Sequence, residues 1–485
     1  MDEQLILGID IGTSAAKAVL ATGSGRILAR ASYPQHVARP EPGRAEQDPD
    51  SWWVAVRVLV AETWRVVAGH PTPPLAGVAI SGHFPTLVAC DAAGVPVMPA
   101  LLYEDTRADG WLAEAARLTG QPLRGDELLP KLLWMRAEQP DLLRSIRHIC
   151  NPQDYLVLRL TGEHVIDHFR AARSGGLLDP AAMTWRNDVV DRVGVDQRAL
   201  PPLRRAGDIA GLVTRPAAAA TGIPEGTPVL VGVADTPAAL IGAGVVRRGD
   251  VLLYYGTTTT ADVCTHDMET YLLDPATVVQ GAPYREVAYA ALGPALAWAA
   301  AGFDRPSEPG ADLAGLDREV STLQTELTAP YVLPDFLAHS GPDARPRLSA
   351  LIGFDIRHGR IDLHRALLEA FGFAVRAGLE ESETWELATR FVASGGGAHS
   401  APWRQIVSDI LGVEQVWPLS SGGALGDAML VAWANGLTDF RGGLARWLQV
   451  GDRTWPNKGA HGVYDARYRT WLLLRDHVAA ALGDS

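Results

Sequence analysis

Residues 4–34 read QLILGIDIGTSAAKAVLATGSGRILARASYP and contain three aliphatic segments separated by short turns with glycine and hydroxyl residues. Aliphatic and β-branched runs of this length predict strands, and the short turns predict that neighbouring strands pair antiparallel. The chain is therefore expected to open on a three-stranded meander. Farther along, predicted helices at residues 49–67 and 107–118 enclose a predicted strand at residues 75–81. This alternation is typical of the α/β class.

A second segment repeats the plan of the first. It starts at Gly249, runs through aliphatic and aromatic residues, and reaches the turn Gly256-Thr257-Thr258, as the first segment reaches Gly12-Thr13-Ser14. The two copies open regions of similar length, which predicts two domains. We expect these domains at residues 1–246 and 247–485.

Composition limits the possible classes of function. The 485 residues exceed what one hydrophobic core usually organises, so an active-site cleft between domains is feasible. A net charge of −13 disfavours a nucleic-acid partner and favours a small-molecule one. Cys90, Cys150 and Cys264 lie far apart in sequence and predict neither a disulfide nor a zinc site.

The chain shows no sign of export or of a membrane partner. Its first residues lack the basic flank and apolar stretch of a signal peptide, so we expect a cytoplasmic protein. The most apolar later stretch, residues 287–303, is interrupted by Gly293 and Pro294 and is too short to span a bilayer, so it predicts a buried helix. The sequence leaves open whether the protein is a homodimer.

The first turn could bind phosphate. Asp10 lies within a predicted strand, and the turn after it offers backbone amides and the hydroxyls of Thr13 and Ser14. Amides and hydroxyls donate hydrogen bonds to phosphate oxygens, and a nearby carboxylate can hold magnesium through its water shell. A plain β-hairpin with a capped turn explains the same residues equally well.

Two more segments could bind a nucleotide. The hydroxyl-rich turn at Gly256, Thr257 and Thr258 could grip phosphates from the opposite side, although threonine is also simply a good strand residue. The segment Gly395-Gly396-Gly397-Ala398 follows a predicted strand, and its bare backbone would let an adenosine lie close to the chain. A turn with one positive φ angle would need only one of these glycines.

A fourth segment could supply catalysis. Asp235 and Thr236 stand where a buried predicted strand ends and a helix of small residues begins. The Asp235 carboxylate could accept the proton of a substrate hydroxyl that attacks phosphorus. It could also be only the N-cap of the helix, which is the commoner role of aspartate there.

Taken in order, these segments resemble the FGGY family of carbohydrate kinases, with xylulokinases the nearest in appearance. The resemblance covers essentially the entire chain and includes further family-like segments, which are Glu46-Gln47-Asp48-Pro49 with Trp52-Trp53, Ser81-Gly82-His83, Tyr103-Glu104-Asp105, Lys131-Leu132-Leu133-Trp134, Asp154-Tyr155-Leu156 and Ser421-Gly422-Gly423-Ala424-Leu425-Gly426. It implies two ribonuclease H-like domains of the actin-like ATPase type, each a mixed β-sheet flanked by helices, with an active-site cleft between them.

The resemblance also implies ATP and Mg²⁺ as cofactors and assigns residues to them. Asp235 would be the catalytic base, and Asp10 would hold magnesium through water. The nucleotide and its phosphates would be bound by Asp10, Gly12, Thr13, Ser14, Lys17, Gly256, Thr257, Thr258, Gly395, Gly396, Gly397 and Ala398.

Departures from the family pattern fall where a sugar would bind. The chain reads Gly82-His83-Phe84-Pro85 where many members have Gly-Gln and sugar-contacting polar residues, and Thr236 follows Asp235 where asparagine is frequent. Our candidates for sugar contact are His83, Phe84, Glu104, Asp105, Asp235 and Thr236.

The expected substrate is a ketose or polyol, with a pentulose such as D-xylulose first among them. A tetrulose, ribulose, fuculose or glycerol-like polyol is an alternative within the same family. An actin-like ATPase without sugar chemistry, and a degenerate kinase that only senses its ligand, remain open as other classes. Phosphorylation of a sugar, measured as ADP release, separates the first class from the other two.

Overall fold

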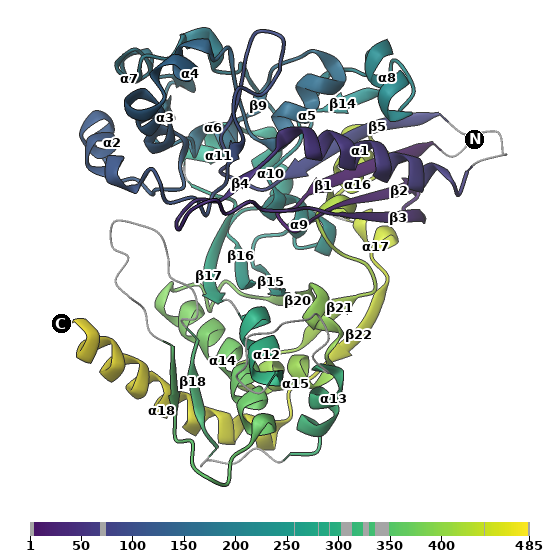
Figure 1. Ribbon diagram of the computed structural model, residues 1–485. Coiled ribbons are helices and arrows are strands. Elements are labelled where there is room, and N and C mark those ends of the chain that lie inside the picture. Colours follow the sequence, from purple (N-terminus) through teal and green to yellow (C-terminus); the bar gives the residue numbers. More distant parts are fainter. Residues whose placement is uncertain are drawn as a thin grey trace.

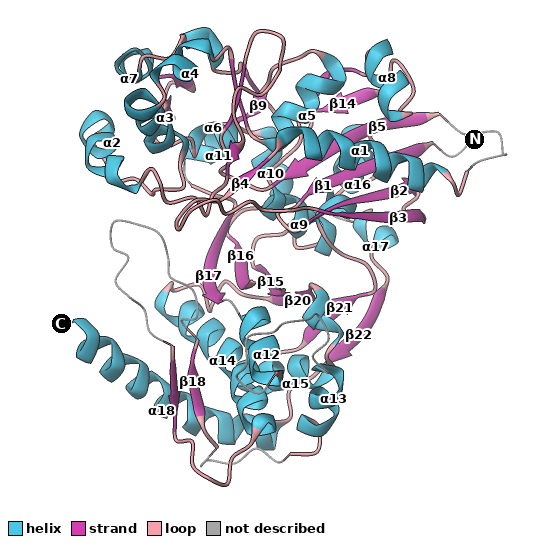
Figure 2. Ribbon diagram, in the orientation of Figure 1, coloured by secondary structure: helices cyan, strands magenta, loops and turns pink. Residues whose placement is uncertain are grey.

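The computed structural model describes residues 4–67, 74–256, 258–279, 281–290, 292–301, 313–323, 329–334, 349–440 and 442–483. Two lobes lie one above the other, and each is built around a six-stranded mixed sheet with helices against it (Figures 1 and 2). The predicted α/β class and the mixed, helix-flanked sheets are confirmed.

The first sheet contains the predicted meander at its edge. Its strand order is β13-β14-β5-β1-β2-β3. β1, β2 and β3 pair antiparallel, whereas β5 lies parallel to β1 and β14 parallel to β5. The strands span Leu5–Ile11 (β1), Ala15–Thr22 (β2), Ile27–Pro34 (β3), Leu75–Gly82 (β5), Ile209–Leu212 (β13) and Pro228–Leu230 (β14).

The second sheet has the same plan. Its order is β17-β16-β15-β20-β21-β22, again a meander followed by two parallel strands and one antiparallel edge strand. The strands span Asp250–Tyr255 (β15), Thr259–Cys264 (β16), Tyr284–Ala290 (β17), Arg390–Ser394 (β20), Gln415–Pro418 (β21) and Val450–Thr454 (β22). The similarity of the two turns in sequence therefore reflects a repeated topology.

Residues 287–303 differ from the expected helix. β17 continues to Ala290, and only the helix α12, Leu292–Ala300, matches the prediction. A register shift between Ala261 and Asp262 places an extra residue in β17, so the alternation of polar and apolar residues that marks a strand is broken there.

Each sheet has its own helices and core. In the first lobe α1 (Pro49–Trp64), α5 (Pro152–Thr161) and α8 (Arg215–Thr221) contribute to one hydrophobic cluster with β1, β5 and β14. In the second lobe the corresponding cluster contains α12, α14 (Arg360–Glu381), α15 (Ala401–Leu411) and α18 (Lys458–Gly483). A further helical layer of the first lobe, with α2 (Leu112–Thr119), α3 (Leu128–Glu138) and α7 (Asn187–Val193), packs through leucine and valine side chains.

Two helices join the lobes. α9, Asp235–Ala243, follows the first sheet, whereas α16, Gly423–Ala434, follows β21 of the second sheet but packs on β1 and β5 of the first. The two helices cross at Gly242 and Gly426, where a Cβ on Gly426 would lie 1.8 Å from the carbonyl oxygen of Ala238. Backbone therefore touches backbone at the crossing, and α9, α16 and parts of both sheets share one core.

None of the helices in the described parts of the chain combines the length and the hydropathy that crossing a bilayer requires.

Candidate active site

Asp10 lies on the face of β1 that meets α16. Ile6, Gly8 and Asp10 alternate along this face, and a Cβ on Gly8 would lie 2.0 Å from the carbonyl oxygen of Ala424. A Cβ on Gly423, the first residue of α16, would lie 2.6 Å from the carboxyl carbon of Asp10. The helix thus begins directly against the Asp10 carboxylate, and glycine is required at both contacts.

A buried hydrogen-bond chain fixes this carboxylate. Ser81 on β5 stands beside Asp10 in the parallel pairing, and its hydroxyl lies 3.1 Å from Asp10 Oδ1 and 2.7 Å from Asp427 Oδ2. The backbone N–H of Ser81 also donates to Asp427 Oδ2, at 3.2 Å. One hydroxyl proton cannot serve two carboxylates, so both contacts hold when one of the two acids is protonated.

Asp427 is the more deeply buried of the two acids. It lies on α16 with 0% of its surface exposed. Burial, together with the nearby charge of Asp10, raises the pKa of Asp427 well above its usual value. Asp10 is only partly buried and stands opposite Lys17 in the β1–β2 pairing, and the ammonium group counteracts the rise that burial causes in the Asp10 pKa.

Asp235 is the first residue of α9. Its Oδ1 accepts a hydrogen bond from the backbone N–H of Thr236 at 2.8 Å, and Ala234 occupies the N-cap position. Burial and the neighbouring charge of Asp10 raise the pKa of Asp235 to about 7. A carboxyl group that titrates near neutral pH can both accept and release a proton there.

Tyrosines and threonines of both lobes surround these two acids. Burial raises the pKa of Tyr284 in the second lobe, and the nearby Thr236 side chain of the first lobe lowers this pKa in part. Tyr254 on β15 lies close enough to Asp10 and Asp235 for their charges to raise its pKa, although burial contributes more. Burial also raises the pKa values of Tyr103 and Tyr289, and the nearby side chains of Thr13 and Thr258, respectively, lower them in part. Thr257 lies outside the described residues.

The glycine segment ends β20 in the second lobe. Gly395 has a φ of +92°, and a Cβ there would lie 2.6 Å from the carbonyl oxygen of Tyr255. A Cβ on Gly397 would lie 2.6 Å from the Trp403 ring, whereas a Cβ on Gly396 would meet nothing within 4 Å. Two of the three glycines are therefore required by the fold, and only Gly396 has open space above it.

Comparison with known proteins identifies the family. The N-terminal domain model of the FGGY family of carbohydrate kinases matches residues 5–242, and the C-terminal domain model matches residues 253–435. The chain belongs to the FGGY family of carbohydrate kinases. It is thus an enzyme that phosphorylates a sugar or a related small molecule, and kinases of this family use ATP.

Individual relatives agree with this assignment. The kinase is 29% identical to a xylulose kinase of Lactococcus lactis, over 90% of this chain and 88% of that protein, and 28% identical to a xylulose kinase of Escherichia coli, over 88% of each. Among solved structures, the xylulose kinase of Rhodospirillum rubrum matches with a TM-score of 0.82 and 29% identity, covering 99% of this chain and 100% of that one. The predicted actin-like ATPase fold is confirmed.

Two side chains that were expected to contact the sugar are hydrogen-bonded to other groups of the protein. The two ring nitrogens of buried His83 lie 2.8 Å from the Thr86 hydroxyl and 3.1 Å from Gln47 Oε1. Asp105 is 1% exposed, and its two carboxylate oxygens accept hydrogen bonds from the backbone of Ala45 and from Arg107. The polar atoms of both side chains thus already have partners within the protein, and their contact with a sugar stays a prediction.

The other candidates lie nearer the space between the lobes. Phe84 packs against Phe169, with ring centroids 6.3 Å apart, and Phe169 in turn contacts Tyr284 of the second lobe. Glu104 forms an ion pair with Arg39 at 2.7 Å, and its charge reaches Tyr289. These two residues remain candidates for sugar contact.

Sequence reasoning missed an acidic pair on the second sheet. Asp262 and Glu286 face each other across β16 and β17, next to the bulge in β17. Asp262 is 2% exposed, and burial together with the Glu286 charge raises its pKa to about 8. The only local signal for Asp262 in the sequence was its position two residues after Thr260. The Thr260 hydroxyl donates a hydrogen bond to Asp262 Oδ2 at 2.9 Å.

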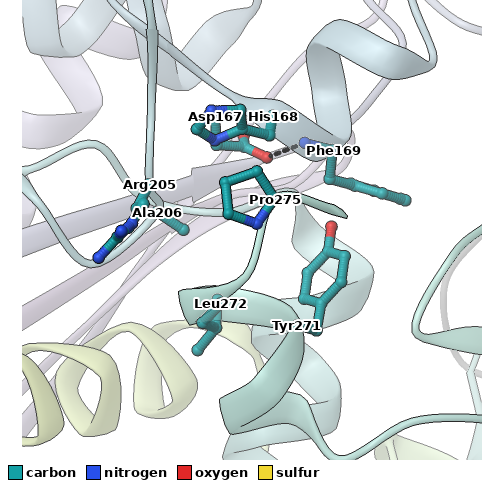
Figure 3. A pocket seen from close by; sticks show the side chains of 8 residues that line it. All are labelled: Asp167, His168, Phe169, Arg205, Ala206, Tyr271, Leu272 and Pro275. Carbon is teal, nitrogen blue, oxygen red and sulfur yellow. Dashed lines mark hydrogen bonds between the residues drawn. The ribbon is translucent and has the colours of Figure 1, made fainter. Parts of the chain in front are cut away.

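A separate small cavity lies where α6, His168–Ala172, approaches α10, Met268–Leu273 (Figure 3). Its volume is about 10 Å³, room for one water molecule, and its lining includes Phe169 and Tyr271. The buried Tyr271 hydroxyl has no hydrogen-bond partner among the described residues. None of the predicted site residues of the kinase lines this cavity.

Proposed function

We propose that this kinase transfers the γ-phosphoryl group of ATP to a hydroxyl of a ketose or polyol, with a pentulose such as D-xylulose as the first substrate to test. The observation that carries the proposal is the Asp235 carboxylate, whose pKa is raised to about 7 beside Asp10 at the start of the helix that joins the lobes. The names of the xylulose kinase relatives support the choice of pentulose.

In this proposal Asp235 is the general base. It accepts the proton of the substrate hydroxyl while that oxygen attacks the terminal phosphorus, and the backbone N–H of Thr236 holds the carboxylate in place. A contact between Tyr284 of the second lobe and the Thr236 side chain of the first lies next to this group. It would help to exclude water that could otherwise receive the phosphoryl group.

The residues present fit a magnesium ion held mainly by phosphates. No group of three or more His, Cys, Asp or Glu side chains suited to a metal occurs among the described residues, which agrees with an ion that has few protein ligands. Asp10 offers a hard carboxylate oxygen that is already oriented by Ser81. When bound, the ion would neutralise charge on the phosphates. Asp10, Lys17 and the turn at Gly12, Thr13 and Ser14 would then position them.

The nucleotide would lie between the two turns and against the glycine segment. Thr258 and Gly256 are proposed for the phosphates, together with Thr257, which lies outside the described residues. The open space at Gly396 supports the placement of adenosine at Gly395, Gly396, Gly397 and Ala398.

A screen of ADP release with purified protein tests the proposal. Pentuloses, hexuloses, tetruloses and polyols are added singly with MgATP, and we expect one class to raise ADP release at least tenfold over the rate without sugar. Mass spectrometry of the product then identifies the phosphorylated hydroxyl. Tight sugar binding without ADP release for every compound would contradict the proposal and favour a sensor.

A further inference from the structure

Asp427 is a buried acid to which no role in the reaction has been given above. The side chains around it on α16 are apolar or absent, and it is 0% exposed. Its Oδ1 has no hydrogen-bond partner among the described residues, whereas its Oδ2 accepts a hydrogen bond from the backbone N–H of Ser81 and lies 2.7 Å from the Ser81 hydroxyl. Burying a polar group in this way costs free energy, so a fold alone would be better served by an apolar residue there.

The only polar path from Asp427 in the described structure leads to Asp10. Ser81 Oγ is 2.7 Å from Asp427 and 3.1 Å from Asp10 Oδ1, and the first residue of α16, Gly423, contacts the same carboxylate. The Asp10 carboxylate is therefore enclosed between Ser81 and the beginning of α16. A change at Asp427 reaches Asp10 through one side chain.

The loop before α16 reaches a second part of the site. The hydroxyl of Ser394, at the end of β20, donates a hydrogen bond of 2.8 Å to the hydroxyl of Ser421. Gly395 follows Ser394 directly, so one continuous segment, residues 421–427, contacts both the residue before the glycine segment and the acid beside the phosphate turn.

We propose that Asp427 is a positioning residue for phosphoryl transfer, which orients the Asp10 carboxylate through Ser81 for magnesium-bound phosphate. The inference rests on the proposed function, because it gives Asp10 the magnesium role. Asp427 itself touches neither nucleotide nor sugar. It supports the proposed magnesium ligand Asp10 through Ser81. The loss of such a supporting residue typically lowers metal affinity by about 10- to 100-fold.

The test compares Asp427→Asn, Asp427→Leu and Ser81→Ala in the full chain. The asparagine keeps a side chain of the same shape that can hydrogen-bond Ser81, and we expect it to resemble the wild type. The leucine removes the hydrogen bonds, and we expect the magnesium concentration for half-maximal activity to rise about 10- to 100-fold. Calorimetry supplies a readout without turnover: the gain in ADP affinity that Mg²⁺ produces should shrink in the leucine variant.

Glu369→Gln is the matched control, because Glu369 is another buried acid, bonded to Arg467 in the core of the second lobe. It should lower the melting temperature without changing the magnesium dependence of ADP binding. If Asp427→Leu behaves in the same way, the proposal is overturned. If Asp427→Leu does not fold, Ser81→Ala gives the answer, because it breaks the same path and must show the same loss of magnesium dependence.

The two proposals can fail separately. A wild type that phosphorylates no compound of the screen but binds ADP more tightly with Mg²⁺ refutes the proposed function, while the calorimetric comparison of variants still decides the role of Asp427. A wild type that phosphorylates a sugar, with variants that keep normal magnesium dependence, refutes only the positioning role.

Discussion

The two lobes share one topology but differ at equivalent positions. Asp10 stands two residues before the first glycine turn, and Tyr254 stands two residues before the second. On the neighbouring parallel strand, Asp10 is paired with Ser81 and Tyr254 with Ser394, so each has a serine beside it. The helices α9 and α16 are equivalent by their symmetric contact at Gly242 and Gly426.

The difference lies in the acids. When Gly242 of α9 is aligned with Gly426 of α16, Asp235 aligns with Leu419 and Asp427 aligns with Ala243. Because α16 packs on the first sheet, Asp10, Asp235 and Asp427 all gather on the side of the first lobe. The second lobe supplies the bare glycines instead. A duplicated fold can thus keep the same framework in both copies and place these acidic residues on the side of only one copy.

The largest expected effect comes from removing the acid that the second lobe lacks. Asp235→Asn should lower kcat by roughly 10²- to 10⁴-fold, because a positioned general base contributes about that much. Calorimetry should show nucleotide affinity close to that of the wild type. Asp191→Asn, a surface change on α7 outside the site, should leave kcat unaltered. Undiminished turnover by Asp235→Asn would remove Asp235 from the mechanism.

A smaller effect is expected where α16 begins. Gly423→Ala places a methyl group 2.6 Å from the Asp10 carboxyl carbon, and the carboxylate must move. Because small misplacements of catalytic groups cost up to about a hundredfold, kcat/KM should fall by roughly 10- to 100-fold. The equivalent residue of α9 is already alanine, Ala239. Gly462→Ala on α18, where a Cβ meets nothing within 4 Å, is the control and should keep wild-type kinetics.

The acid in the first lobe should also set the pH profile. Asp235 has a pKa of about 7 and must be ionised to act as base. The value of kcat/KM should therefore rise about tenfold from pH 5.5 to pH 6.5 and level off above pH 7.5. Initial rates over this range, with saturating MgATP, measure it. A flat profile down to pH 5.5 would show that the group titrates much lower, as an exposed carboxyl does.

The smallest effect concerns stability. In the first lobe Val19 pairs with Gly8 of β1. At the equivalent position of the second lobe, Asp262 pairs with Leu252. The pKa of Asp262 is about 8, against 3.8 for a free carboxyl, so between these values the folded chain binds more protons than the unfolded chain. Its contribution to stability therefore falls as pH rises through this window. Asp262→Asn should raise the melting temperature by a few degrees at pH 8 and by less at pH 5. An equal shift at both pH values would contradict the assigned pKa.

The repeated meander and the main site segments could be predicted because their signals are local. Gly12, Gly256 and Gly395 each follow a run of strand residues, and Asp235 stands where a strand gives way to a helix. Turn and strand chemistry of this kind is encoded within a few residues. The family resemblance then supplied roles that the residues alone left open.

What failed depends on contacts between distant segments. Asp427 sits 346 residues from Ser81, so no local pattern links them. The hydrogen bond between Asp105 and the backbone of Ala45 could not be foreseen either, because the two residues are 60 positions apart. The bulge in β17 hid both that strand and the placement of Glu286, because it breaks the period-2 pattern on which strand prediction relies.

The glycine crossing of α9 and α16 has a mechanical consequence. If the lobes turn relative to each other about this point, an atom moves in proportion to its distance from the fulcrum. Asp235 and Gly423, each within the first turn of a crossing helix, would travel little. Residues at the outer ends of the two lobes would travel farther. A rotation of this kind would move the outer parts of the lobes while the start of each crossing helix stays nearly in place.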